Sequence, residues 1–246
     1  MSARGLPWLA ALALVLLAVW GWRQQARLEP PELLPLAQPE GFFAPRGLGG
    51  AGLSVAMPRL DRAPPPPSGE ALCAALRTGP RAAGLPGKDA VHVAYFTDYR
   101  CPWCRALGAA LEKRAARGDI VLTYQEYPVL GEASRMAARA ALAAWELGAY
   151  APMRARLLAS AFAPNRAYLR AIAPQRGVSA ARLLAELDSP KVDAALLRAA
   201  AAARAFGFRG TPGLVIGAVV VQGGPSEAAL DALIEAARRL PDPCAG

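Results

Sequence analysis

The sequence has little of the material from which metal sites are built. Its 246 residues include one histidine, His92, and four cysteines, of which Cys101 and Cys104 stand close together while Cys73 and Cys244 stand far from them. Structural zinc with cysteine ligands requires a second Cys-x-x-Cys pair or a Cys/His pair. The sequence therefore argues against a zinc site, and we expect the chain to work without a metal or another cofactor.

The sequence also lacks a basic block, although its formal net charge is +9. Arginines are scattered over alanine-rich segments, and no aromatic residues alternate with them. A nucleic-acid surface usually gathers its cations on one face or along one helix. We therefore interpret the charge as belonging to solvated helix faces and expect no nucleic acid as a partner.

Charged residues are absent from the apolar segment between Gly5 and Trp22, which is followed by Arg23. This length lies at the lower limit for a helix that crosses a bilayer. The segment also lacks a cleavage site of the Ala-x-Ala type. We therefore expect residues 1–23 to be an uncleaved anchor in the inner membrane, with the rest of the chain on the periplasmic side. The alternative is a cleaved signal peptide and a secreted periplasmic protein.

Residues 24–88 are rich in proline and glycine and include four consecutive prolines. Such a composition buries too little apolar surface to offset the entropy of ordering the chain. We expect a spacer between the membrane and the folded domain. One short helix is expected within it, near 70–78, because Leu72 and Leu76 are four positions apart.

Residues 89–241 have the length and the apolar content of one domain. We expect these elements in chain order: strand 91–98, helix 101–118, strand 119–130, a helical insertion at about 132–206, two hairpin strands within 213–224, and a last helix that ends before Pro241. A strand, helix and strand in such short order imply parallel pairing with a right-handed crossover. The pattern is therefore α/β: a βαβ unit, a helical insertion and a ββα unit.

Cys101 and Cys104 lie at the predicted junction between the first strand and the helix, in FTDYRCPWCRAL. A Cys-x-x-Cys pair in the first turn of a helix has both sulfurs on one side, close enough to join. The first cysteine faces free backbone N–H groups and the positive end of the helix dipole, which favour its thiolate. We expect Cys101 to be the exposed nucleophile and Cys104 the sheltered resolving thiol. Pro102 stiffens the turn, and Trp103 offers an exposed apolar contact.

Two other roles are chemically open to this cysteine pair. A purely structural disulfide would stabilise little, because closing so short a loop removes little entropy from the unfolded chain. A binding module that uses the two sulfurs as soft ligands for copper(I), or as a contact for a client protein, stays open as a second interpretation. Met136 and Met153 do not strengthen it, since both fall in helical patterns typical of core residues.

The chain resembles the DsbA family of thioredoxin-fold thiol–disulfide oxidoreductases over about residues 89–240. The resemblance rests on FTDYRCPWC at the strand-to-helix junction, EYPVLGEAS at 126–134 and FGFRGTPGLVIG at 206–217. It implies a protein disulfide oxidoreductase with a thioredoxin-like fold. It also implies a cis peptide between Thr211 and Pro212 opposite the sulfurs, which would leave the Thr211 backbone free to pair with substrate. The partners would be cysteine-containing secreted proteins and a membrane-bound or soluble redox partner.

Two departures from the family pattern bear on the mechanism. Thioredoxins keep a buried carboxylate six residues before the first cysteine, where this chain has Tyr95. Glu126 on the next strand is a candidate replacement, and an ion pair with an arginine is its alternative role. The dipeptide between the cysteines is Pro-Trp in place of Pro-His. Without an imidazole beside the thiolate, we expect a weaker oxidant than the strongest members of the family.

The direction of electron flow stays open between an oxidase and a reductase or isomerase. Isomerases of this superfamily usually dimerise through a folded N-terminal domain, which the proline-rich spacer does not resemble. We therefore rank the oxidase first. In the oxidising compartment that this role requires, Cys73 and Cys244 are expected to pair with each other and to restrain both ends of the domain.

Overall fold

The computed structural model describes residues 12–15, 30–46 and 66–245. Residues 12–15 form a single helical turn, and most of the expected membrane anchor, residues 1–23, lies outside the described residues. Within the described ranges, no helix is both long enough and apolar enough to span a bilayer.

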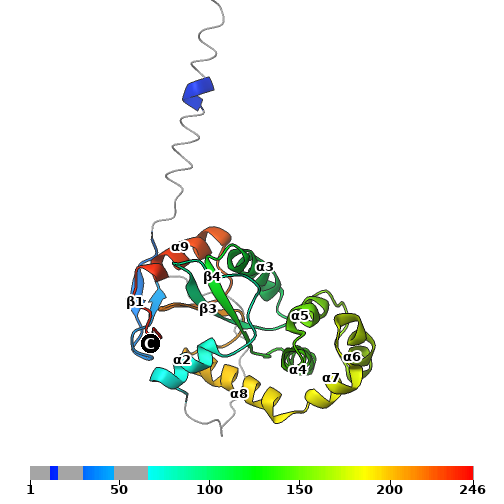
Figure 1. The fold of residues 1–246 in the computed structure, drawn as a ribbon. Coiled ribbons are helices and arrows are strands. Elements are labelled where there is room, and N and C mark those ends of the chain that lie inside the picture. Colours follow the sequence, from blue (N-terminus) through cyan, green and yellow to red (C-terminus); the bar gives the residue numbers. More distant parts are fainter. Residues whose placement is uncertain (1–11, 16–29, 47–65, 246) are drawn as a thin grey trace, which may run out of the picture.

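The described chain contains strands and helices in the order of a βαβ unit, a helical insertion and a ββα unit, preceded by two short strands and one helix (Figure 1). The strands are β1 (Leu33–Pro35), β2 (Phe43–Pro45), β3 (Val91–Thr97), β4 (Ile120–Glu126), β5 (Gly213–Ile216) and β6 (Val219–Gln222). The helices are α2 (Gly69–Arg77), α3 (Pro102–Ala116), α4 (Glu132–Glu146), α5 (Tyr150–Leu158), α6 (Arg166–Ile172), α7 (Ala180–Glu186), α8 (Pro190–Ala205) and α9 (Glu227–Arg238), with a 3-10 turn η1 (Pro174–Arg176).

The strands form one sheet in the order β1-β2-β6-β5-β3-β4. β3 and β4 pair in parallel, as their connection through α3 predicts, while β5 pairs antiparallel with both β3 and β6. β5 and β6 form the hairpin that the sequence predicts. The predicted second strand at 119–130 is shorter than expected and ends at Glu126.

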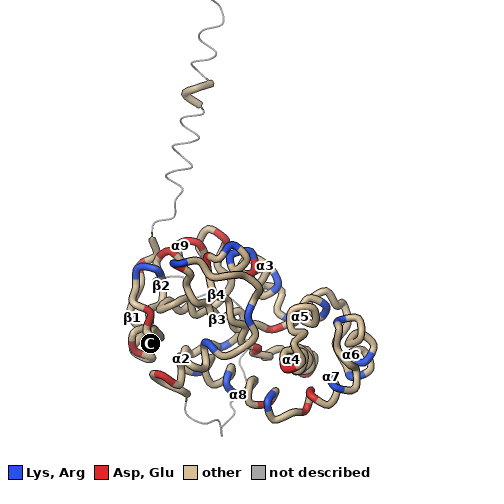
Figure 2. Tube along the Cα trace, viewed as in Figure 1, with Lys and Arg blue, Asp and Glu red and all other residues tan. Residues whose placement is uncertain are grey.

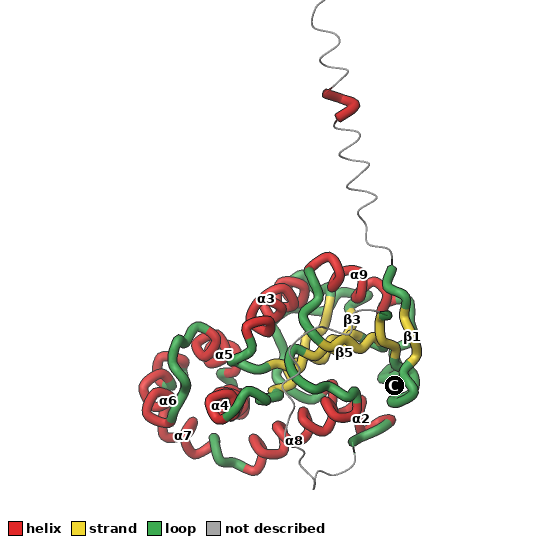
Figure 3. Tube along the Cα trace, turned by 180° about the vertical axis from the view of Figure 1, so that it is seen from behind, coloured by secondary structure: helices red, strands yellow, loops and turns green. Residues whose placement is uncertain are grey.

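Helices cover both faces of the sheet, so β3 is buried on both sides (Figures 1 and 3). Successive side chains of a strand point to opposite faces. Val93 and Tyr95 therefore join the core under α3 and α9, while Ala94 and Phe96 join the core under α2 and α8. A strand of near-continuous apolar residues is the sequence signature of this position.

Helices α4 to α7 of the insertion lie beside the sheet, whereas α8 returns over the sheet face that α2 also covers (Figures 1 and 3). The insertion's core residues Met153, Leu169 and Leu183 are fully buried and continuous with the core under α3. Three of its helices begin at a residue whose side chain accepts a hydrogen bond from the first turn, namely Asn165, Ser179 and Ser189. The insertion is therefore a rigid extension of the same core, broken into several helices by these caps.

The structure differs from the expected spacer at residues 24–88. Residues 33–45 form an antiparallel strand pair, and β2 extends the sheet by pairing in parallel with β6 at Phe43 and Val219. Phe42 is only 3% exposed and packs edge to face on Phe206, with ring centroids 5.0 Å apart. The composition argument was wrong here because an existing sheet edge supplies the hydrogen bonds, so few apolar residues suffice. The folded unit starts well before residue 89.

Candidate active site

The two cysteines occupy the first turn of α3, directly beyond the end of β3. Cys101 is the N-cap residue, and Pro102 is the first residue of the helix. The Cys104 backbone N–H donates to the Cys101 sulfur at 3.3 Å, so this sulfur takes the place that a serine or aspartate oxygen usually holds at a helix start. Both thiols are free, so the geometry described here is that of the dithiol form of the pair.

The Cys101 thiol is less exposed than the sequence predicts. The residue is 5% exposed and Cys104 is 1% exposed, so the expectation of a freely exposed nucleophile was wrong. The cause is the loop before β5, which covers the end of α3. Trp103, in contrast, is 69% exposed and stands beside the sulfurs as an apolar surface residue.

That covering loop contains the Thr211–Pro212 peptide, which is cis. The Cys101 thiol donates to the Thr211 carbonyl oxygen at 3.4 Å. The loop is held there because β5 pairs with the end of β3, where Phe96 lies opposite Gly213. Gly224 lies close to both Trp103 and Pro212, so the segment after β6 also meets this loop and the start of α3.

The surroundings of the two sulfurs shift their acidities in opposite directions. The pKa of Cys101 falls from 9.0 to about 6, chiefly because its thiolate accepts a hydrogen bond from the Cys104 thiol. Burial opposes this shift, while Thr211 and the Cys104 backbone N–H add to it. The pKa of Cys104 is raised well above its usual value, first by burial and then by its hydrogen bond to Cys101. At neutral pH the pair therefore holds one thiolate and one thiol, with the charge on Cys101.

Tyr95 occupies the position at which thioredoxins keep a carboxylate, and it serves a different purpose. Its hydroxyl donates to the Cys104 carbonyl oxygen at 2.6 Å, and the side chain is completely buried. Burial raises the pKa of this phenol well above 10, so it stays protonated. Tyr95 thus fixes the first turn of α3 and supplies no group that exchanges protons at neutral pH.

Glu126 is buried at the end of β4. Its Oε1 accepts hydrogen bonds from Tyr99 at 2.9 Å and from Tyr150 at 2.7 Å. Burial raises its pKa from 4.5 to about 7, against the opposing effect of the Arg154 charge. Arg154 forms its own ion pair with Glu112, at 3.3 Å. Glu126 is therefore a buried acid able to change its charge near neutral pH, joined to the active-site loop through Tyr99.

Asp98 is a site residue that the sequence analysis missed. It is 1% exposed, and its carboxylate accepts four hydrogen bonds. The donors are Arg100 N at 2.8 Å, Val129 N at 2.8 Å, Leu130 N at 3.0 Å and Ser134 Oγ at 2.7 Å. Its backbone carbonyl also accepts from Cys101 N at 3.1 Å. Asp98 therefore ties the active-site turn to the start of α4, and its position between a strand end and a helix start is a signal that could have identified it.

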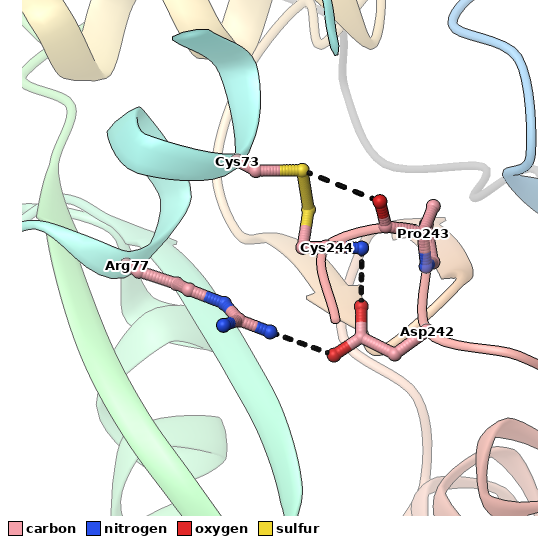
Figure 4. Close-up of a disulfide and its surroundings, with 5 residues drawn as sticks. All are labelled: Cys73, Arg77, Asp242, Pro243 and Cys244. Carbon is pink, nitrogen blue, oxygen red and sulfur yellow. Dashed lines mark hydrogen bonds and ion pairs between the residues drawn. A yellow bond between two sulfur atoms is a disulfide. The ribbon is translucent and has the colours of Figure 1, made fainter. Parts of the chain in front are cut away.

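The remaining two cysteines form a disulfide, Cys73–Cys244, with Cα atoms 5.2 Å apart (Figure 4). An ion pair between Arg77 and Asp242, at 2.9 Å, lies next to it. The bond joins α2 to the C-terminal tail, two elements that contribute nothing to the active site. The structure thus brings together Cys101, Cys104, Trp103 and the Thr211–Pro212 loop, and keeps the Cys73–Cys244 pair apart from them.

Within the described ranges, no three side chains of His, Cys, Asp or Glu are arranged so that they could hold a metal ion. The chemistry that this geometry offers is thiol–disulfide exchange, because a thiolate is the nucleophile of that reaction and Cys101 is a stabilised thiolate beside a second thiol.

Comparisons with known proteins point to the same chemistry. The model of a family described as Thioredoxin matches residues 86–236. A thioredoxin-like oxidoreductase from Silicibacter pomeroyi DSS-3 has a similar structure, with a TM-score of 0.61 and 32% identity over 68% of this chain and 98% of its own. A comparison with curated proteins gives no match.

Two further structures resemble the chain. The catalytic domain of Proteus mirabilis ScsC has a TM-score of 0.58 and 25% identity over 67% of this chain and 93% of its own. The thiol-disulfide exchange protein alpha-DsbA2 from Wolbachia pipientis has a TM-score of 0.59 over 66% of this chain and 90% of its own. At 22% identity the latter shows the fold alone.

The family match covers more than half of the chain, and it includes both cysteines and the Thr211–Pro212 loop. The predicted thioredoxin-like fold and the predicted enzyme class are confirmed. The chain belongs to the thioredoxin family and is a thiol–disulfide oxidoreductase.

Proposed function

We propose that this enzyme is an oxidase of protein thiols on the periplasmic side of the inner membrane, acting on cysteines of secreted proteins. The observation that carries the proposal is the contrast between the two sulfurs. Cys101 is a thiolate at neutral pH, with a pKa of about 6, while Cys104 keeps its proton. Because of that contrast, Cys101 serves as the nucleophile of the exchange and Cys104 as the resolving thiol.

The reaction proceeds in two exchanges. A client thiolate attacks the Cys101 sulfur of the Cys101–Cys104 disulfide, the bond between the two enzyme sulfurs breaks, and Cys104 leaves and takes up a proton. A second thiolate of the client then attacks the client sulfur of the mixed disulfide, and Cys101 leaves as a thiolate. The client gains one disulfide, and its two electrons remain on the enzyme as the reduced pair. A partner that carries a more oxidising disulfide must remove them.

The acidity of Cys101 favours the oxidising direction. A thiolate that is stable in the reduced enzyme makes the disulfide form easier to reduce, hence a better oxidant. Lowering the pKa from 9.0 to about 6 stabilises the reduced form at pH 7 by about 1.4 kcal/mol, or about 30 mV. This modest gain accords with the weaker oxidant that Trp103 in place of histidine leads us to expect.

Two features support the location. The apolar segment between Gly5 and Trp22 has the composition of a membrane anchor, or of a signal peptide in the alternative. The Cys73–Cys244 disulfide is typical of a protein that folds in an oxidising compartment. The described N-terminal strands add to the sheet of their own domain, which differs from the folded N-terminal dimerisation domain of an isomerase.

The test is the redox state of Cys101 and Cys104 in living cells, trapped by rapid alkylation. A pair that is mostly disulfide supports the oxidase, and a pair that is mostly dithiol supports a reductase or isomerase. In parallel, purified Cys101→Ser and Cys104→Ser are compared in the oxidation of a dithiol peptide. The Cys73→Ser/Cys244→Ser double variant is the control. Activity that survives both active-site substitutions would remove the redox assignment.

A further inference from the structure

Three exposed arginines lie close in the sequence to the residues of the active site. Arg100 precedes Cys101, Arg105 follows Cys104, and Arg209 lies two residues before Thr211. We refer to Arg100, Arg105 and Arg209 as the cationic rim. We propose that the cationic rim makes the enzyme select client segments in which acidic residues flank the reacting cysteine. This inference rests on the proposed function, since it names the clients of the same site.

The rim residues are placed at the sulfurs by the backbone. Arg105 directly follows Cys104 in the first turn of α3 and is exposed there. Arg209 is held by a hydrogen bond between its backbone N–H and the side-chain amide of Gln222 on β6. Arg209 belongs to the same loop as Thr211, whose carbonyl oxygen contacts Cys101.

The charges of the rim are available to a bound partner. All three arginines are exposed. Among the residues that the structure describes, no carboxylate forms an ion pair with any of the three. Each guanidinium therefore faces solvent with its donors free for a carboxylate.

The acids on the surrounding elements are already engaged. Asp98 is buried and accepts four hydrogen bonds, and Glu126 is buried between two tyrosines. Glu132 at the start of α4 pairs with Arg135, and Glu227 at the start of α9 lies 3.9 Å from Arg114. The mouth of the site thus keeps an excess of positive charge on its surface.

The overall charge of the protein does not carry this argument, because basic residues also occur along α6, α7 and α8 (Figure 2). What distinguishes the rim is that each of its arginines stands within two positions of Cys101, Cys104 or Thr211 in the sequence, on the segments that also hold Trp103, which is 69% exposed. When the cysteine of a peptide binds next to Cys101, the side chains that flank it come within reach of the three guanidinium groups and of the Trp103 indole.

Charge at this position acts on both the encounter and the chemistry. Opposite charges raise the rate of association, by roughly 10-fold or more at low ionic strength. A carboxylate beside a cysteine normally disfavours the thiolate of that cysteine. Near the cationic rim this penalty is offset, so an acidic client forms its attacking thiolate more readily when bound than in free solution.

The test uses two synthetic dithiol peptides that differ only in the residues flanking their cysteines, glutamate in one and lysine in the other. The disulfide form of the enzyme oxidises each under second-order conditions at low salt and in 1 M sodium chloride. We expect the acidic peptide to react about 10-fold faster at low salt. The ratio should fall toward one in 1 M salt, where charges are screened beyond about 3 Å.

Two triple variants with the same change in net charge distinguish an effect of the cationic rim from an effect of the overall charge. Arg100→Gln/Arg105→Gln/Arg209→Gln removes three charges at the site and should abolish the preference. Lys113→Gln/Arg170→Gln/Arg182→Gln removes three exposed charges elsewhere and should keep it. The ratio of the two peptide rates within one variant is compared, so a general change in sulfur reactivity cancels.

Each outcome decides a separate question. If the wild-type enzyme oxidises both peptides at equal rates at low salt, the inference about acidic clients is overturned and the proposed function stands. The same holds if the control variant loses the preference as fully as the rim variant. If the wild-type enzyme oxidises neither peptide, the proposed function itself fails.

Discussion

Cys101 ionises readily although it is almost buried, because its position at the start of α3 provides donors that water would otherwise supply. The sulfur accepts from the Cys104 backbone N–H at 3.3 Å and from the Cys104 thiol. The same contact and deeper burial keep Cys104 protonated. One hydrogen-bonded pair therefore separates the roles of two chemically identical side chains.

The first prediction concerns the acidity of this sulfur. The rate at which iodoacetamide alkylates the reduced enzyme should rise with a midpoint near pH 6, since only the thiolate reacts. Cys104→Ala removes the largest stabilising hydrogen bond and should raise the midpoint by about 1 to 2 pH units. Cys104→Ser keeps a donor and is the control. A wild-type midpoint near that of free cysteine would contradict the assignment of Cys101 as the stabilised thiolate.

The second prediction concerns Glu126, whose pKa rises from 4.5 to about 7 on folding. A group whose pKa is raised in the folded state destabilises it as the pH rises between these two values, because the unfolded chain releases the proton first. Glu126→Gln keeps the acceptor oxygen and removes the charge. Between pH 5 and pH 8 the variant should gain about 2–3 kcal/mol of unfolding free energy relative to the wild type, measured in urea. A difference that does not change with pH would show that Glu126 ionises normally.

At the scale of elements, β2 attaches to the edge of the sheet through very few residues. The register contains one pair with β6, Phe43 with Val219, and the adjacent Phe42 supplies the apolar contact with Phe206. Edge strands this short expose few unpaired backbone groups. Phe42 is thus the large side chain of this segment that is fully buried, while Leu33 and Leu36 add partly buried contacts.

The third prediction tests that ring. Phe42→Ala should lower the free energy of unfolding by about 3 kcal/mol, because a buried phenylalanine leaves a cavity when it is truncated. Leu34→Ala is the control, since Leu34 in β1 is 41% exposed and its loss should change stability by less than about 0.5 kcal/mol. Urea unfolding of both variants gives the values. If Phe42→Ala lowers the free energy of unfolding as little as Leu34→Ala does, the strand pair contributes nothing to the stability of the folded unit.

The elements that could be predicted from the sequence are those with a clear apolar pattern of their own, either a continuous run or a helical spacing. β3, β5 and β6 are runs of apolar, mostly β-branched residues, α3 and α9 have helical spacing of their own, and all five appear where expected. The strands β1 and β2 have three residues each, too few to show a period, and they form only because a neighbouring edge accepts them.

The same distinction holds in the active site. Cys101 and Cys104 could be found from their spacing, and Pro212 only through the family resemblance. Asp98 could be found only in part: its place between a strand end and a helix start, with Arg100 N as a local donor, indicates a turn, but its link to α4 depends on donors more than thirty residues away in the sequence.

At the scale of the whole molecule, the Cys73–Cys244 disulfide spans 171 positions and joins the helix before β3 to the tail after α9 (Figure 4). A bond that closes so long a loop removes much of the entropy of the unfolded chain. The ion pair between Arg77 and Asp242 aligns the same two segments. The disulfide therefore acts on the stability of the domain as a unit.

The fourth prediction separates this role from catalysis. The Cys73→Ser/Cys244→Ser variant should lose about 2–5 kcal/mol of unfolding free energy in the absence of reductant. Its rate of alkylation at Cys101 should match that of the wild type, since neither residue contacts the site. A loss of reactivity with unchanged stability would reverse the assignment and make the pair a second redox centre.

The closed loop also has a consequence for a protein exposed to proteases. A cut at any surface turn between α2 and the C-terminal tail divides the polypeptide but leaves both pieces covalently held. The nicked molecule would migrate as one band on a non-reducing gel and as two after reduction. The core helices and strands would remain in register, so such a molecule could survive damage that would release half of an unlinked chain.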